Sequence, residues 1–143
     1  MRYLIGSRFF FRNFKDFRSH DTDYIEILDT NEFQKKRVIR GQGKDIIQLR
    51  RKSKEEIIKD ALNETLPMCV GKFLIPNFCK EIGFTVEDLV YVKPLIDKLD
   101  KKHLYEKIIY ESYLKNNDFT LTEEQLLEAY QSYKEARYLW KLN

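Results

Sequence analysis

The chain has 143 residues, of which 43% are hydrophobic and 14% are aromatic, with only five Gly and three Pro. This composition excludes an intrinsically disordered chain, and the length suits one compact domain or two small regions that share a core. No apolar run is long enough to cross a bilayer and no secretory leader is visible, so we expect a cytoplasmic protein without a membrane partner.

The net charge of +3 is unevenly distributed along the chain. Residues 1–52 carry 13 Lys and Arg against 7 Asp and Glu, whereas residues 53–143 carry 13 against 16. A basic first part suits a polyanionic partner such as a nucleoside triphosphate, with a nucleic acid as one candidate acceptor. A solvated basic surface without a partner is an equally good explanation for any single one of these cations.

The first elements in chain order are a short strand, a glycine turn and a helix. An apolar run at residues 3–5 ends at Gly6 and Ser7, and residues 8–18 have phenylalanines at helical spacing. Glycine allows a sharp turn and a close approach of the backbone to a ligand, and the helix N-terminus that follows attracts anions. We therefore expect a phosphate to bind at Gly6 and Ser7, within reach of Arg8.

A second strand, residues 24–28, follows two aspartates that are one residue apart, Asp21 and Asp23. Because side chains alternate along a strand, both carboxylates share one face, which Ile25 and Ile27 continue. Two like charges at the end of a buried strand destabilise the fold unless a cation neutralises them or they are open to water. A divalent metal that prefers oxygen ligands satisfies this pair. An Asx-type turn at residues 21–23 is the alternative without a ligand.

The order and spacing of these parts resemble the signature of a known superfamily. A strand, Gly6-Ser7, thirteen residues, Asp21-x-Asp23 and a second strand are similar to the motif of the nucleotidyltransferases with a DNA polymerase beta-like catalytic fold. The resemblance implies that Gly6 and Ser7 lie on the phosphates of the nucleotide. It also implies that Asp21 and Asp23 bind Mg²⁺, with Mn²⁺ as the other candidate metal.

Residues 37–40 and 44–50 are two β-prone runs around a Gly-rich turn, which predicts a hairpin. The resemblance implies a third carboxylate on a strand beside the Asp-x-Asp strand. Asp45 is the only acid of the hairpin and is our candidate for this catalytic and metal-binding position, although it stands close to the turn. Without a third ligand, the domain would bind a nucleotide but would not transfer it.

From Ser53 onwards the hydrophobic period changes from two to about 3.6, which predicts a helical region. Capping boxes open helices at Ser53, at Thr85 and at Thr122, and Pro94 either kinks the second of these or divides it into two shorter pieces. Tyrosines at helical spacing in the last two helices indicate core positions rather than a base-stacking platform. Lys72 follows a glycine but lacks the rest of a P-loop, so we expect a surface lysine.

The two cysteines, Cys69 and Cys79, have neighbouring apolar residues and no zinc-type spacing around them. We expect buried thiols rather than a disulfide or a metal site.

Together these features predict an α+β fold, with a small mixed β-sheet nucleotidyltransferase core at residues 1–52 and a C-terminal helical bundle at 53–143. The activity that the resemblance implies is transfer of a nucleoside monophosphate from a nucleoside triphosphate to an acceptor hydroxyl of a nucleic acid, a protein or a small molecule. Two alternatives remain open. One is a catalytically degenerate member that binds nucleic acid or a partner protein, and the other is a basic interaction domain without catalysis.

Overall fold

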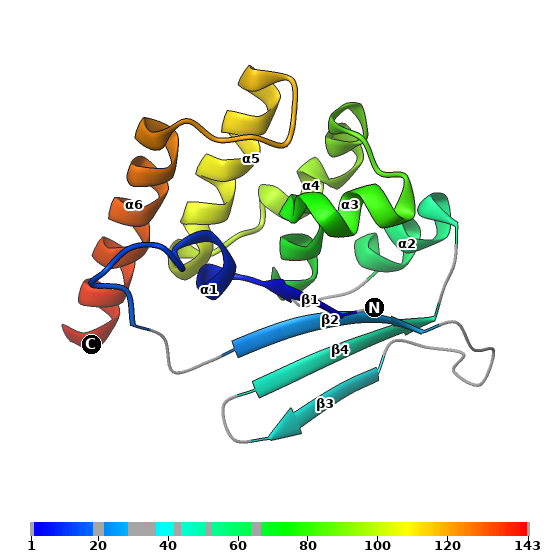
Figure 1. The fold of residues 1–143 in the computed structure, drawn as a ribbon, viewed down its shortest axis with the longest axis horizontal. Coiled ribbons are helices and arrows are strands. Elements are labelled where there is room, and N and C mark those ends of the chain that lie inside the picture. The colour runs from blue at the N-terminus through cyan, green and yellow to red at the C-terminus, as the bar shows by residue number, and fades with distance from the viewer. Residues whose placement is uncertain are drawn as a thin grey trace. The chain divides into compact units, whose positions relative to one another are not determined.

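The computed structural model describes residues 2–18, 22–28, 37–41, 44–50, 53–63 and 67–142, with the side chains of 37–41, 44, 45, 50, 67–69 and 139–142 left out. The chain divides into two compact units, Met1–Ser53 and Lys54–Asn143. A sheet forms the first unit and helices form the second (Figure 1). The predicted α+β class, with a mixed sheet ahead of a helical region, is confirmed. None of the helices described has the length and apolar character needed to span a membrane.

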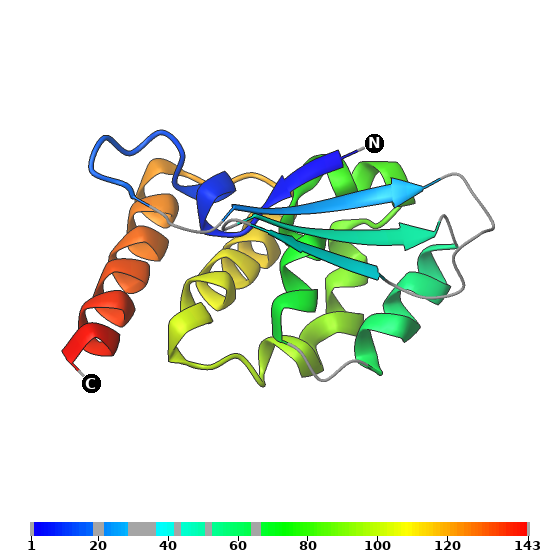
Figure 2. The same cartoon turned by 90° about the horizontal axis from the view of Figure 1, so that it is seen from below.

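Four strands form the sheet in the order β1-β2-β4-β3 (Figure 2). Their bounds are β1 Arg2–Ile5, β2 Thr22–Leu28, β3 Arg37–Gly41 and β4 Lys44–Arg50. Strand β2 pairs antiparallel with β1 and parallel with β4. The antiparallel pairing of β3 with β4 confirms the hairpin that the glycine turn predicts. The strand after the Asp-x-Asp motif is therefore an interior strand of the sheet.

One face of the sheet is a continuous apolar surface. The register aligns Tyr3, Ile25 and Ile47 across β1, β2 and β4, and all three are buried. Ile5 and Ile27 are also buried and lie on the same face, because side chains two residues apart point the same way. On the opposite face the described side chains are half-buried or exposed. The period-two pattern of the sequence placed Ile25 and Ile27 on one face, and the structure shows that this face is the buried one.

The aromatic segment after β1 is folded differently from the prediction. Helix α1 (Ser7–Phe10) is a single turn, and the helix expected over residues 8–18 does not continue beyond it. Instead, backbone hydrogen bonds from Phe14 to Phe11 and from Phe17 to Phe14 form successive turns. Phe11 is fully buried, and its ring lies 6.2 Å from that of Phe14 and 6.0 Å from that of Phe17. The aromatic cluster forms around Phe11 rather than along a helix face.

The second unit consists of short helices followed by two long ones. Its described elements are α2 Lys54–Leu62, η1 Pro67–Leu74, α3 Pro76–Ile82, η2 Val86–Val92, α4 Lys93–Ile96, η3 Lys101–His103, α5 Leu104–Asn116 and α6 Glu123–Leu142. Elements η1, η2 and η3 are 3-10 helices. As predicted, the chain near Pro94 forms two shorter pieces, because proline is tolerated at the start of α4 but not inside a helix.

The helix boundaries follow the capping residues of the sequence. Thr122 and Gln125 form reciprocal side-chain to backbone hydrogen bonds of 2.9 and 3.1 Å at the start of α6. The Asp88 carboxylate accepts hydrogen bonds from the backbone and hydroxyl of Thr85 at 2.8 and 3.1 Å, which caps η2. At the end of α5, Asn117 adopts the left-handed conformation with φ of 56°, where Asn is one of the few residues tolerated.

Buried tyrosines connect the elements of this unit. Tyr113 is buried and donates a 2.9 Å hydrogen bond to the carbonyl of Leu74, while Tyr110 donates one of 3.1 Å to that of Leu89. Each hydroxyl thus has a hydrogen-bond partner, which a buried polar group needs. The expectation that these tyrosines are core residues is confirmed.

Candidate functional site

The glycine turn at the end of β1 has the conformation that a close approach requires. Gly6 has φ of 77° and ψ of −163°, a combination that residues with a side chain rarely adopt. Its carbonyl accepts a 3.0 Å hydrogen bond from the amide of Phe9, which closes the single turn of α1. Because α1 is one turn long, the helix dipole contributes less to anion binding than the sequence implied. The predicted phosphate site therefore depends on the local backbone of Gly6 and Ser7.

Asp23 lies directly beside this turn. It is the register partner of Ile5, the last residue of β1, and its side chain is half-buried. A Cβ atom added to Gly6 would lie 3.8 Å from Asp23 Oδ2, which is an ordinary van der Waals distance. The glycine turn and one acid of the Asp-x-Asp motif, separated by 16 residues of chain, thus converge at one end of the sheet.

Asp45 occupies the corresponding position on the next strand. The Cα atoms of Asp23 and Asp45 are partners in the parallel β2·β4 pair, so the two residues share one face of the sheet. Each is the second residue of its strand, at the amino-terminal end. The Asp45 side chain and all of Asp21 lie outside the described residues. Metal ligation by the three aspartates stays a prediction.

A hard divalent cation is the metal expected at this end of the sheet, because Mg²⁺ and Mn²⁺ prefer carboxylate oxygens as ligands. Among the described side chains, no group of three His, Cys, Asp or Glu residues could hold a metal ion. The described side chains do not include those of Asp21 and Asp45, which are two of the three predicted metal ligands.

Comparison with protein-family models, curated proteins and solved structures finds no match to this chain. The assignment to a function therefore depends on the geometry of the chain itself.

The arginines of the segment after Ser7 divide into two groups. Arg12 donates a hydrogen bond to the carbonyl of Phe9, with its guanidinium 4.4 Å from the centre of the Phe9 ring. Arg18 donates hydrogen bonds of 3.1 and 2.8 Å to the carbonyls of Lys15 and Phe17. Both therefore stabilise the turns of this segment. Arg8 is exposed on α1, next to Ser7, and its contact with a phosphate stays a prediction.

Lys72 and Glu106 of the helical unit are buried, which the sequence did not indicate. Lys72 is 4% exposed and its ammonium lies 5.1 Å from the centre of the Phe73 ring, so the expectation of a surface lysine is wrong. Glu106 is 3% exposed and accepts a 3.3 Å hydrogen bond from the hydroxyl of Tyr105. A Cβ atom on Gly71 would lie 3.3 Å from Glu106 Oε1, which is closer than most contacts of a Cβ atom, so the backbone of Gly71 packs tightly against this carboxylate. The local sequence has no signal for either burial, because both depend on tertiary packing.

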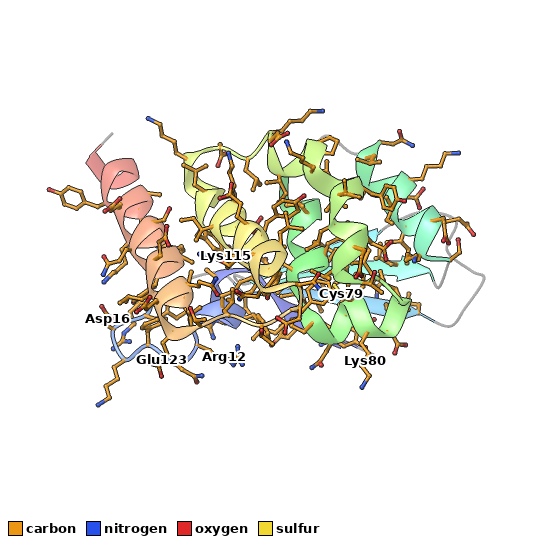
Figure 3. The ribbon with its side chains drawn as sticks, turned by 90° about the horizontal axis from the view of Figure 1, so that it is seen from above. Arg12, Asp16, Cys79, Lys80, Lys115 and Glu123 are labelled. Atoms are coloured by element: carbon orange, nitrogen blue, oxygen red, sulfur yellow. The ribbon has the colours of Figure 1, made fainter. Side chains whose placement is uncertain are left out.

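The described cysteine is a structural thiol. Cys79 is fully buried and free, and Figure 3 shows it inside the helical unit, while Lys80, the next residue of α3, projects outwards. Burial raises the pKa of the Cys79 thiol well above its usual range. The thiol therefore stays protonated at neutral pH and is a poor nucleophile and a poor metal ligand. This confirms the expectation for Cys79, whereas the Cys69 side chain lies outside the described residues.

Proposed function

We propose that this chain is a metal-dependent nucleotidyltransferase, which moves a nucleoside monophosphate from a nucleoside triphosphate to an acceptor hydroxyl and releases pyrophosphate. The observation that carries the proposal is the position of Asp23, with its Oδ2 atom beside Gly6 and its Cα atom paired with that of Asp45. A turn that admits a polyphosphate and acids that bind a divalent cation are both needed for this chemistry. The basic character of residues 1–52 favours a polyanionic substrate.

Each residue has a defined part in the proposed site. Asp23 and Asp45, together with Asp21, would hold Mg²⁺ or Mn²⁺ through carboxylate oxygens. Gly6 and Ser7 would seat the triphosphate, and Arg8 would donate to one of its oxygens. When bound, the metal supplies positive charge that lowers the pKa of the acceptor hydroxyl and stabilises the leaving pyrophosphate.

The reaction requires little further acid or base chemistry from the chain. The acceptor oxygen forms a bond to the α-phosphorus, the bond from that phosphorus to the β-phosphate oxygen breaks, and the hydroxyl proton passes to solvent. The aspartates and the glycine turn would orient the triphosphate so that attack is in line. The chain has only two histidines, which is compatible with this division of roles.

Calorimetric titration with ATP, with and without Mg²⁺, tests the proposal. We expect Mg²⁺ to strengthen ATP binding, and we expect Asp23→Asn to remove the Mg²⁺-dependent part because one charged oxygen ligand is lost. Asp16→Asn is the matched control, since it removes an exposed acid from the same unit but outside the site. Binding that is unaffected by Mg²⁺ and by Asp23→Asn would instead support a basic interaction domain.

The acceptor can be identified by transfer of label. Incubation of the protein with each α-labelled nucleoside triphosphate and a cell lysate should label one class of macromolecule, and Asp23→Asn should prevent it. Mg²⁺-dependent binding without any labelled product would support the catalytically degenerate alternative.

A further inference from the structure

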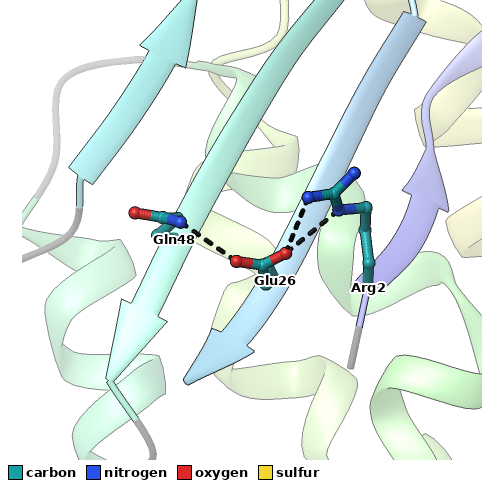
Figure 4. A network of polar contacts seen from close by, with 3 residues as sticks. All are labelled: Arg2, Glu26 and Gln48. Carbon is teal, nitrogen blue, oxygen red and sulfur yellow. Dashed lines mark hydrogen bonds and ion pairs between the residues drawn. The ribbon is translucent and has the colours of Figure 1, made fainter. Parts of the chain in front are cut away.

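Glu26 joins the three strands that carry the parts of the proposed site. It lies on β2, three residues after Asp23, and therefore on the opposite face of the sheet. Its Oε2 atom accepts a 3.0 Å hydrogen bond from Nε of Arg2 on β1 and forms an ion pair with Nη2 of the same guanidinium, also at 3.0 Å. Its Oε1 atom accepts a 3.0 Å hydrogen bond from Nε2 of Gln48 on β4 (Figure 4). One carboxylate thus contacts both strands that flank β2.

The register of the sheet places the residues of these contacts opposite one another. Arg2 is the Cα partner of Glu26 in β1, and Gln48 is its partner in β4. The Glu26 side chain is 18% exposed, so its charge is partly removed from water. The hydrogen bond from Gln48 lowers the pKa of Glu26, burial opposes this, and Arg2 adds to the lowering. Glu26 is therefore ionised at neutral pH, and its hydrogen bonds are charge-assisted.

The row of paired residues Arg2, Glu26 and Gln48 extends towards β3, the fourth strand of the sheet. Gln48 Oε1 is buried and has no hydrogen-bond partner among the described side chains. Arg37 of β3 is the Cα partner of Gln48. The sequence thus places a cationic residue at the next position of this row, on the far side of Gln48 from Glu26.

The apolar face of the sheet does not fix the register alone. If β1 slid along β2 by two residues so that Tyr3 opposed Ile27 and Ile5 opposed Ile25, apolar side chains would still face one another there. Arg2 would then oppose Leu28, which cannot replace the Glu26 carboxylate as an acceptor. A two-residue slide of β4 would likewise remove Gln48 from Glu26 and would move Asp45 about 7 Å from its place beside Asp23.

We propose that Glu26 is a positioning residue for the metal and nucleotide site, because it holds the strand that leads to Gly6 and the strand that carries Asp45 in register with Asp23. This role rests on the proposed function. Glu26 itself touches neither metal nor substrate, since it lies on the other face and about 10 Å along β2 from Asp23.

The test compares binding with stability in matched variants. Glu26→Ala removes both contacts, Arg2→Ala removes only the contact with β1, and Gln48→Ala removes only the contact with β4. Glu26→Gln keeps an oxygen acceptor and is the conservative variant. Leu4→Ala is the control, because Leu4 is a half-buried residue of the same face of β1 without a polar contact to Glu26. Urea unfolding and calorimetric titration with Mg²⁺-ATP are measured for each variant, under conditions where it is folded.

We expect Glu26→Ala to weaken Mg²⁺-ATP binding about tenfold, the low end of the range for groups that orient metal ligands without touching the metal. Arg2→Ala and Gln48→Ala should each cause a smaller loss, and Glu26→Gln should restore most of the affinity. Leu4→Ala should lower stability without a matching loss of affinity. If Glu26→Ala does not fold, the comparison of Arg2→Ala and Gln48→Ala with Leu4→Ala decides the question.

The outcomes separate the two proposals. Absence of Mg²⁺-dependent binding by the unaltered chain would overturn the proposed function and, with it, the role of Glu26. Normal binding by the unaltered chain together with normal binding by the folded Glu26, Arg2 and Gln48 variants would overturn only the positioning role. A loss of affinity in Leu4→Ala equal to that in Glu26→Ala would also overturn it, because general destabilisation would then explain both.

Discussion

Substitution of Gly6 by alanine tests the backbone conformation of the glycine turn separately from its steric contacts. Gly6 has φ of 77° and ψ of −163°, a region that is essentially restricted to glycine. A side chain in such a conformation costs about 1–3 kcal/mol. The new methyl group would lie 3.8 Å from Asp23 Oδ2 without overlap, so steric repulsion adds nothing. We therefore expect Gly6→Ala to lower the free energy of unfolding by about 1–3 kcal/mol, all of it from backbone strain.

The same substitution should impair the proposed site more than it impairs the fold. The chain can relieve the strain only by rotating the turn away from its present position beside Asp23, and the methyl group occupies space next to the carboxylate. A displacement of about 1 Å in a reacting site can lower the reaction rate up to about a hundredfold. Because the same turn would seat the triphosphate, we expect Mg²⁺-ATP affinity to fall at least about tenfold. Urea unfolding followed by circular dichroism gives the stability, and calorimetric titration gives the affinity.

Gly83→Ala provides the control for Gly6→Ala. Gly83 ends α3 in the left-handed conformation with φ of 75°, and nothing lies within 4 Å of an added Cβ atom. Alanine there should cost about 1–2 kcal/mol and leave nucleotide binding unchanged. Equal affinity of Gly6→Ala and the unaltered chain would refute the assignment of Gly6 to the nucleotide site. An equal loss of affinity in both variants would indicate general destabilisation instead.

Three further predictions concern the helical unit. Tyr113→Phe should lower the free energy of unfolding by about 1–3 kcal/mol in urea, because the buried carbonyl of Leu74 loses its donor. Asp88→Asn should cost about 0.5–2 kcal/mol at pH 7, since the charged cap on Thr85 is weakened. Burial opposes ionisation of Asp88, but hydrogen bonds from Thr85 and the Lys54 ammonium, 3.1 Å from Oδ2, outweigh it and lower the pKa. The contribution of its charge is thus complete above about pH 4 and is lost as the pH falls through the lowered pKa, so unfolding at pH 3 should show a smaller difference. Cys79 should resist alkylation at pH 8 in the folded protein and react after denaturation, because its thiol is buried and protonated.

Much of the fold could be predicted from local patterns because the responsible forces are local. The period-two alternation of β2 placed Ile25 and Ile27 on the same face of an interior strand, and both are buried. The reciprocal bonds of Thr122 and Gln125 start α6 at the position the sequence indicated. In each case, neighbouring side chains and backbone groups are sufficient to determine the conformation.

Two errors arose where distant residues decide the outcome. Phenylalanines at a spacing of three and four residues suit a helix, but the same spacing also suits successive turns, and burial of Phe11 selected the turns. The burial of Lys72 has the same origin, because no residue near it in the sequence shows that its long side chain packs in the interior. Tertiary packing overrides local propensity in both segments.

The position of Asp45 illustrates a third kind of limit. Judged from its own hairpin, Asp45 stands too close to the turn to resemble a ligand in the middle of a strand. Judged from β2, its position is the expected one, since Asp23 is also the second residue of its strand and the two Cα atoms are partners. The sequence does not reveal that β4 rather than β3 pairs with β2, nor the register of that pair. The position of Asp45 close to the turn is therefore no argument against it. When two parallel strands begin at the same level, residues that face each other lie equally far from the start of each strand.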